Sequence, residues 1–306
     1  TYIGGEAFYN CSGLASVDFG SNVSSIGGSA FYGCSSLKSV EIPGKVTSID
    51  KYTFHSCSAL ESVSIPGSVT KIHAYAFINC SGLKYVTIED GSESLYMGAS
   101  GSNTVFSYCP LDSVYIGREH SYSGNYSPFY NNSSLRAVTM GENVTKIGER
   151  EFYGCKNLSS VTISENVDSI GTYAFYNCDS VTSVTIPKSV KAISAYAFYH
   201  CGELASINVP GVDDPEYTTT IGAYAFAYCK KMSSASVGER VSSIGNNAFY
   251  ACDYLLKFYS YATTPPSLGT NVFTACNSSL GIYVPLPYYS TYITTTGWKD
   301  LNIKQL

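Results

Sequence analysis

A phenylalanine and a cysteine recur at a fixed spacing along the whole chain. Most successive cysteines are 23 residues apart, and phenylalanine stands three residues before each of them. The one gap of 46 residues, from Cys109 to Cys155, holds Asn132 at its midpoint, also with phenylalanine three residues before it. The cysteine column therefore has twelve members, eleven Cys and one Asn. A period of this length predicts a repeat architecture.

Each cysteine is followed by apolar residues at constant offsets. The turn after Cys57 shows the pattern, with apolar residues at +3, +6, +8, +12 and +15, namely Leu60, Val63, Ile65, Val69 and Ile72. The stretch from +5 to +8 alternates small polar with β-branched residues, as in "SVSI" (62–65) and "SVTI" (183–186). This alternation predicts a strand with one buried face.

A single turn of 23 residues cannot bury its own apolar side chains, but a stack of turns can. We therefore predict a mostly β solenoid that forms one domain over residues 1–306, with about twelve turns and an incomplete first turn. One parallel sheet would form one face, with strands ~4.8 Å apart over a length on the order of 55 Å. The "I-G-x-x-A-F" segment is too short for a full helix and would form the opposite wall.

The template L-x-x-V-x-I-P-x-x-V-x-x-I-x-x-x-A-F-x-x-C resembles the 23-residue treponemal-type leucine-rich repeat of BspA-like surface proteins, over essentially the whole chain. The resemblance implies a right-handed leucine-rich-repeat arc, with the parallel sheet on its concave face and short turns or 3-10 segments on its convex wall. Residues 262–306 look like the closing segment of such an array, with Trp298 over the last turn. Because Thr1 begins in the middle of a repeat, we expect an upstream segment, in which a targeting signal would lie.

The cysteine spacing gives one thiol per turn and no C-x-x-C motif. Adjacent Cα atoms ~5 Å apart would fall within disulfide range, but parallel side chains in a column point the same way. We therefore expect buried free thiols, slow to react, rather than disulfides or a metal site. Asn132 in a cysteine position predicts a ladder of hydrogen bonds to the backbone.

Many of the 28 tyrosines also lie in columns, two and five residues before the cysteine position. One interpretation is an aromatic ladder on the outer wall, with the rings stacked from turn to turn. The other is a rigid contact surface, because tyrosine supplies contact area at low entropic cost. The sequence leaves both open.

The outward strand positions are mostly Ser and Thr, residue types that seldom contribute much of the binding energy at an interface. Tyrosine replaces them at Tyr85, Tyr115 and Tyr259. Three irregular segments, 89–104, 118–127 and 211–220, follow strands and should project from one edge, where inserted residues often bind partners. They supply the remaining candidate ligand-binding residues: Tyr96, His120, Tyr122, Tyr126 and Tyr217. Drift in a tolerant loop is the alternative.

Several classes of function find no support in the sequence. The net charge is −5 and no run of Lys or Arg could follow a phosphate backbone, so nucleic acid is not an expected partner. No apolar stretch is long enough to span a bilayer. The four histidines are dispersed and the common catalytic motifs are missing, so we expect neither an enzyme nor a cofactor.

The resemblance implies a cell-surface or secreted bacterial protein that adheres to host matrix or cell-surface proteins. The expected partner is a protein of a host or neighbouring cell, or a glycan, and the expected state is a monomer outside the cell. The alternative is a structural spacer that presents another domain and has no ligand of its own.

Overall fold

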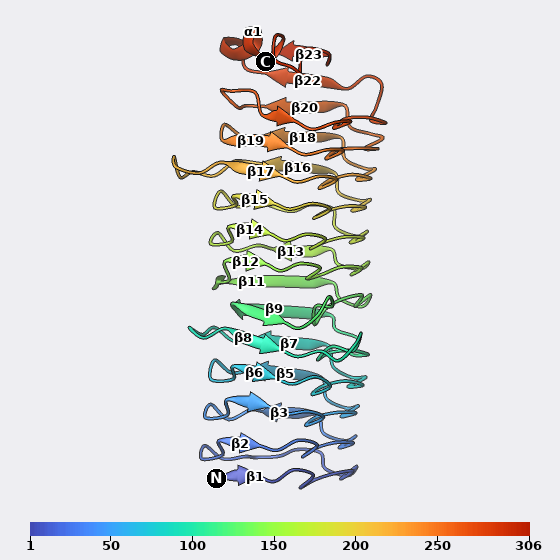
Figure 1. Ribbon diagram of the computed structural model, residues 1–306. Helices are drawn as coiled ribbons and strands as arrows, with labels where there is room; N and C mark the ends of the chain where they lie inside the picture. The colour runs from blue at the N-terminus through green and yellow to red at the C-terminus, as the bar shows by residue number, and fades with distance from the viewer. The chain divides into compact units, whose positions relative to one another are not determined.

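A computed structural model describes residues 1–306. The chain forms two compact units, Thr1–Val144 and Thr145–Leu306. Both units repeat one turn: a strand after the cysteine, a second and usually shorter strand, and a run of tight turns that leads to the next cysteine. Figure 1 shows the strands of each unit stacked turn upon turn. The predicted parallel β solenoid is confirmed.

In the first unit, the strands that follow the cysteines form a parallel sheet with the order β11, β9, β7, β5, β3, which we call the first sheet. Its valines lie in register, because Val63 pairs with Val40 on one side and Val86 on the other. The strands are β3 (Ser39–Glu41), β5 (Ser62–Ile65), β7 (Tyr85–Ile88), β9 (Ser113–Arg118) and β11 (Ala137–Asn143).

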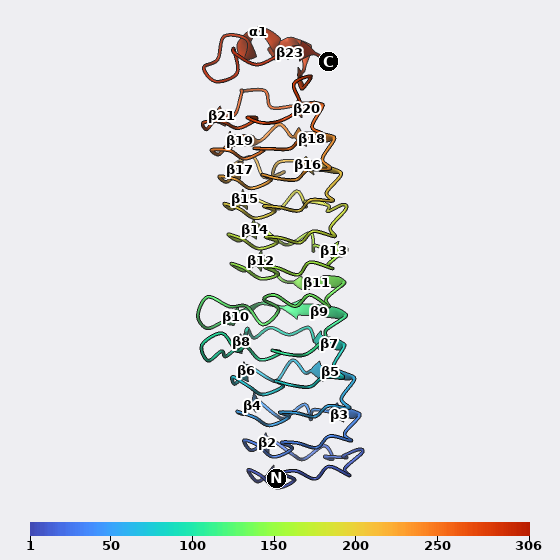
Figure 2. The ribbon, with the colours of Figure 1, turned by 90° about the vertical axis from the view of Figure 1, so that its right-hand side faces the viewer.

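The first unit also has a second parallel sheet, which the sequence analysis did not predict. Figure 2 shows the two sheets on opposite sides of the stack. The regular turns place Ile in the core and its neighbour outside, as Ile72 and Lys71 do. This alternation covers only two residues in a regular turn, too few to recognise as a strand by pattern. The strands are β4 (Ser48–Ile49), β6 (Lys71–Ile72), β8 (Leu95–Met97) and β10 (His120–Tyr122), while β1 (Tyr2–Ile3) pairs with β2 (Ser25–Ile26).

The second unit repeats this arrangement. Its first sheet has the parallel order β16 (Ser206–Val209), β18 (Ser234–Val237), β20 (Lys257–Ser260), β22 (Gly281–Val284) and β23 (Ile303–Gln305). Its second sheet has the order β12 (Lys146–Ile147), β14 (Ser169–Ile170), β15 (Ala192–Ile193), β17 (Thr219–Ile221), β19 (Val241–Ile244) and β21 (Ser267–Leu268). A short strand, β13 (Ser160–Thr162), lies in the turn after Cys155.

The strand predicted at 183–186 is not formed. Ile186 is buried and Val184 half-buried, so the alternation persists, but the main chain makes no strand there. The alternating sequence pattern arises because every second side chain is buried. Such burial does not require the backbone to form hydrogen bonds with a neighbouring turn. The prediction of a strand at 183–186 was therefore wrong.

The phenylalanine column is the centre of the core. In the first unit, the rings from Phe8 to Phe129 stack with centroids 5.0 to 6.1 Å apart. In the second unit, the rings from Phe152 to Phe273 stack with centroids 5.0 to 5.8 Å apart. Offset-stacked rings at this distance attract one another and exclude water, so the column joins successive turns.

The wall between the second strand and the cysteine is built from tight turns with left-handed residues. Tyr52, Tyr75 and Ser56 have φ values of 62°, 68° and 58°. The backbone of each turn also donates to the next turn, as Phe31 N does to Thr53 O at 2.9 Å. The predicted short turns are therefore confirmed, and they form a hydrogen-bonded layer of their own.

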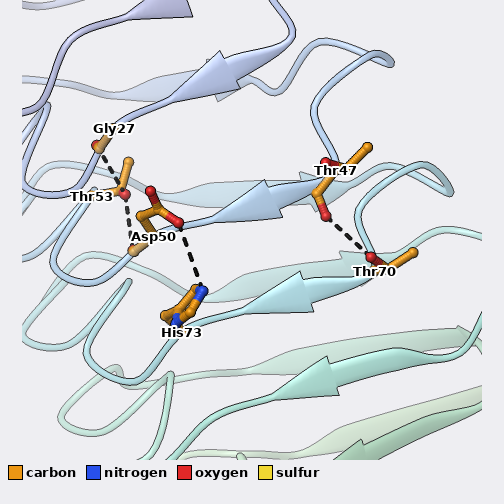
Figure 3. Close-up of polar contacts among 6 residues, drawn as sticks. All are labelled: Gly27, Thr47, Asp50, Thr53, Thr70 and His73. Carbon is orange, nitrogen blue, oxygen red and sulfur yellow. Dashed lines mark hydrogen bonds and ion pairs between the residues drawn. The ribbon is translucent and has the colours of Figure 1, made fainter.

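Side chains add further bonds between turns, as Figure 3 shows. The buried Thr53 hydroxyl donates to Asp50 O at 2.9 Å and lies 3.5 Å from Gly27 O of the preceding turn. His73 Nε2 lies 3.7 Å from Asp50 Oδ1, one turn away. The stacking of turns removes the Thr53 hydroxyl from water, and its bond to Asp50 O satisfies it, whereas the His73 and Asp50 side chains stay partly exposed.

The cysteines form the predicted hydrogen-bonding ladder. Cys57 Sγ donates to Phe31 O at 3.2 Å, and the same bond recurs in other turns of both units. Asn132 replaces the thiol with its amide and donates Nδ2 to Cys109 O at 2.8 Å. All eleven thiols are free; nine are buried, Cys276 is half-buried and Cys11 is exposed. The expectation that every thiol is shielded was thus wrong for Cys11, because it belongs to the outermost turn of its unit.

The C-terminal segment packs on the last turns of the second unit. It contains a 3-10 helix, η1 (Leu286–Tyr288), the short α1 (Tyr289–Tyr292) and β23. Trp298 is fully buried and donates Nε1 to Pro266 O at 2.7 Å. Tyr292 lies against it, with ring centroids 4.9 Å apart.

Candidate functional site

The first sheet of the first unit carries two of the predicted tyrosines on its outer surface. Tyr85 on β7 is paired with Ser113 on β9, and Tyr115 on β9 is paired with Thr87 on β7. The two rings therefore project from adjacent strands, offset by one outward position along the sheet. Tyr85 has 48% of its surface exposed, while Tyr115 is half-buried. The structure brings these two residues together.

Tyr115 is held in place by an acidic partner. Its hydroxyl donates to Asp90 Oδ1 at 3.0 Å. Partial burial and this hydrogen bond raise the pKa of the Tyr115 hydroxyl. A Cβ atom at Gly141 would lie 2.6 Å from the Tyr115 oxygen, and one at Gly117 would lie 2.7 Å from Asp90 Oδ1. Glycine at these two positions leaves room for the pair.

Tyr96 lies on the other side of the first unit. It is an outward residue of β8 in the second sheet, aligned with Lys71 and Ser121. Lys71 Nζ is 5.9 Å from the ring centroid, which is within the range of a cation–π contact. Because the two sheets lie on opposite sides (Figure 2), Tyr96 does not share a surface with Tyr85.

His120 and Tyr122 belong to β10 and not to a projecting loop. His120 is only 9% exposed and pairs with the buried Leu95, and Tyr122 pairs with the buried Met97. Their rings are 6.2 Å apart. The segments 89–104 and 118–127 therefore each contribute a strand to the second sheet, and the expectation of simple projecting loops was wrong. In β10 the core-facing positions hold His120 and Tyr122, which hid that strand in the sequence, whereas β8 has the apolar Leu95 and Met97 there.

Two predicted residues lie in the second unit. Tyr217 follows the loop that begins after β16, and Lys191 Nζ is 3.9 Å from its ring centroid. Part of segment 211–220 also forms the start of β17. Tyr259 on β20 is outward-facing and stacks on Tyr283 of β22, with centroids 5.2 Å apart. The structure does not bring Tyr217 and Tyr259 together. Tyr217 lies beside Lys191 near the second sheet, whereas Tyr259 belongs to the first sheet.

The tyrosine columns stack as the ladder interpretation predicted. In the first unit, Tyr52 and Tyr75 have centroids 5.1 Å apart. In the second unit, Tyr153, Tyr176 and Tyr199 stack at 4.5 and 5.0 Å. The ring edges and hydroxyls remain partly accessible, so stacking does not decide whether the columns also contact a partner.

The turn wall of the first unit contains a hollow that was not predicted from the sequence. Its volume is about 600 Å³, and Tyr126, Tyr108, Thr104, Ser107 and Asn132 are among the residues that line it. Of the predicted residues, only Tyr126 borders it. The available signal was Ser107, which stands two residues before a cysteine where many turns have tyrosine.

Burial makes most thiols of the cysteine column unreactive, whereas a hydrogen bond with Cys252 lowers the pKa of the half-buried Cys276 thiol. Burial raises the pKa of the Cys57 thiol to about 12, with a further contribution from Cys34. Burial likewise raises the pKa of Cys178 and Cys201 well above the ordinary value. A thiol that stays protonated is a poor nucleophile and a poor metal ligand. No group of three or more His, Cys, Asp or Glu residues is arranged to hold a metal ion, and no helix has the length and apolar character to cross a membrane.

Comparisons with known proteins found several similar solved structures. No curated protein matches the chain. A leucine-rich repeat protein of T. pallidum is 23% identical over 69% of this chain and 86% of its own, with a TM-score of 0.47. One from Bacteroides ovatus is 21% identical over 100% of this chain and 87% of its own, with a TM-score of 0.48. The pneumococcal vaccine antigen PcpA is 13% identical over 88% and 83%, with a TM-score of 0.37.

The family comparison covers nearly every residue. A family model described as the BspA type leucine rich repeat region, built of six copies, matches residues 1–100, 99–214 and 211–305. The matched ranges include every cysteine of the column and both units of the structure. The chain belongs to the BspA-type leucine-rich repeat family.

Proposed function

We propose that this chain is the binding module of a cell-surface or secreted bacterial protein, and that it attaches to a protein of a host or neighbouring cell. The family supports a surface module that binds protein, and the fold is typically a binding scaffold rather than an enzyme. The contact surface would be the outer face of the first sheet in the first unit, centred on Tyr85 and Tyr115.

The observation that carries this proposal is the contrast between the two tyrosines and their surroundings. Neighbouring outward positions on the sheet hold small residues such as Ser62, Ser64 and Thr139. Tyr85 therefore stands above a flat surface, and its ring is accessible to a partner. Tyrosine is enriched among residues that dominate binding energy, whereas serine and threonine are not.

Tyr115 strengthens the argument because its position is already restricted. The bond to Asp90, for which the two neighbouring glycines leave room, limits its freedom before any partner binds. A restricted ring loses less conformational entropy on association than a mobile one. The pair thus combines one exposed ring with one oriented hydroxyl.

Binding of the purified, labelled chain to an array of host matrix and cell-surface proteins tests the proposal. The double variant Tyr85→Ser with Tyr115→Ser should weaken a saturable interaction at least tenfold. Tyr2→Ser with Tyr254→Ser is the matched control, since it removes two more exposed tyrosines that lie outside this surface, with 78% and 62% exposure. The control should retain binding.

A spacer without its own ligand is the alternative, and the serine- and threonine-rich outward positions favour it. In that case no array protein binds at micromolar concentration. Equal loss of binding in the test and control variants would also contradict the proposed surface.

A further inference from the structure

The hollow in the turn wall of the first unit arises from a break in the tyrosine columns. Two residues before Cys109 the chain has Ser107, and five residues before it Thr104. At the first of these positions the following turn has Tyr130 and the preceding turn Ile78, and at the second the preceding turn has Tyr75 and the following turn Ser127. An open hollow of about 600 Å³ lies beside these two small side chains. This volume lies within the range of roughly 300–1,000 Å³ that is common for small-ligand sites.

The floor of the cavity is ordered by its own hydrogen bonds. Thr104 is 5% exposed, and its amide donates to Ser107 Oγ at 2.8 Å. Its hydroxyl lies 3.3 Å from both Ser107 Oγ and Pro128 O. Phe106 of the core column is also among the lining residues. The cavity therefore has a fixed polar floor beside an apolar surface.

The rim consists of aromatic rings and amides. Tyr126 and Tyr130 meet edge to face, with centroids 4.8 Å apart. Tyr108 is 72% exposed and has a left-handed φ of 62°, so the backbone turns its ring outward at a conformational cost. The Asn132 amide is oriented by its bonds to Cys109 O at 2.8 Å and from Ser134 N at 3.3 Å.

The chemistry of the lining selects a class of ligand. The lining residues are Ser, Thr, Asn and Tyr, with Pro, Phe and Cys, and none of them is charged. Hydroxyls and amides both donate and accept hydrogen bonds, as the hydroxyls of a sugar do. Aromatic rings pack against the apolar C–H faces of a sugar ring. We propose that this cavity is a binding site for a neutral saccharide of one to three residues.

Other ligand classes fit less well. A phosphate or carboxylate group would require a cation or charge-assisted donors, which the lining lacks. An extended peptide that adds a strand needs unpaired backbone groups. The backbone here is already engaged between turns, because Phe77 N donates to Val105 O at 3.3 Å and Asn79 N to Ser107 O at 3.1 Å.

This site is independent of the proposed protein-binding surface. The cavity lies in the turn wall, whereas Tyr85 and Tyr115 project from the first sheet. A saccharide site would add a second kind of partner to the module. Either proposal can fail without the other.

Saturation-transfer NMR on the full chain tests the proposal with a panel of neutral trisaccharides: chitotriose, cellotriose, maltotriose and xylotriose. A charged sugar, 3′-sialyllactose, and a neutral Gly-Ser hexapeptide serve as comparators. We expect saturable transfer to at least one neutral trisaccharide and to neither comparator. No transfer to any neutral trisaccharide, or equal transfer to a comparator, overturns the proposal.

Two variants locate the site. Ser107→Tyr restores the ring found at this column position and should fill the cavity, so that saccharide affinity falls at least tenfold. Tyr108→Asn removes the rim ring but keeps a residue that tolerates left-handed backbone, and should weaken binding at least threefold. If Ser107→Tyr does not fold, as judged by circular dichroism, Tyr108→Asn decides.

The Tyr85→Ser with Tyr115→Ser variant should bind the saccharide as the native chain does. Loss of saccharide binding in that variant, with retention in Ser107→Tyr or Tyr108→Asn, would place the sugar on the sheet face and contradict the proposal. Loss of protein binding in the sheet variant with retained saccharide binding would support both proposals separately.

Discussion

Tyr173 and Tyr196 stack on successive turns with ring centroids 4.8 Å apart, and both residues have a backbone φ of 59°. A left-handed conformation is uncommon for a bulky residue and costs roughly 1–2 kcal/mol. The same conformation recurs at Tyr224, which stacks on Tyr196 at 4.8 Å. Ring contacts on both sides of Tyr196 therefore offset an unfavourable backbone.

Replacing Tyr196 by glycine separates these two contributions. Glycine adopts the left-handed conformation without penalty but removes the contacts with Tyr173 and Tyr224. The two stacked pairs together contribute about 1–3 kcal/mol beyond area burial, and relief of the left-handed backbone returns roughly 1–2 kcal/mol. With the lost burial of the ring, we expect a net loss of up to about 2 kcal/mol in the free energy of unfolding. Urea denaturation measures it, and a variant at least as stable as the native chain would contradict the interpretation.

Phe175→Ala tests the buried phenylalanine column. Phe175 is fully buried and stacks on Phe152 at 5.3 Å and Phe198 at 5.0 Å. The substitution leaves a cavity between two rings and should cost roughly 3–5 kcal/mol. Phe175→Leu keeps much of the volume and should cost less. A loss below about 1 kcal/mol for the alanine variant would show that the column is not the centre of the core.

Thiol labelling tests the cysteine ladder. In the native state, Cys11 should react rapidly because it is exposed, and Cys276 more slowly because it is half-buried. The nine buried thiols should resist a charged reagent because they are shielded from solvent, and at Cys57, Cys178 and Cys201 a raised pKa also suppresses the thiolate. Unfolding should release all eleven. Mass spectrometry counts the labels, and fewer than eleven after unfolding without reductant would indicate disulfides.

The stability of the second unit should fall at high pH through its tyrosine column. Burial, followed by the neighbouring Tyr228 and Tyr176, raises the pKa of Tyr199 from 10.0 to about 12. Below the pKa of tyrosine in the unfolded chain, which is 10.0, Tyr199 is protonated in both the folded and the unfolded state. Its contribution to the free energy of unfolding is then fully present. As the pH rises from 10.0 toward about 12, the unfolded state loses the proton first and is favoured.

Comparison of the native chain with Tyr199→Phe isolates this effect from other alkaline groups. Urea unfolding at about pH 8 and about pH 11 should show a smaller loss of stability in the phenylalanine variant. The substitution retains the ring, so stacking on Tyr176 is preserved. An identical loss in both proteins would exclude Tyr199 as a contributor.

Much of the fold follows from the sequence, because each turn must satisfy the same local demands. Residues such as Phe54, Val63 and Ile72 recur at fixed offsets, and a turn can bury them only against its neighbours. The period therefore determines a solenoid, a first sheet, a phenylalanine column and a cysteine ladder. The outward positions of Tyr85 and Tyr115 on the first sheet also follow, since their offsets from the cysteine place them between the core-facing residues of their strands.

The tertiary structure decided features that depend on which side chains meet across turns. The second sheet, the burial of His120 and the bond from Tyr115 to Asp90 join residues that no short pattern links. The hollow beside Ser107 has the same origin. The small side chains of Thr104 and Ser107 border a hollow only because the rings of Tyr126 and Tyr130 in the next turn enclose the space beside them. Repetition determines the contacts that every turn shares, whereas irregular turns acquire their contacts only once the chain is stacked.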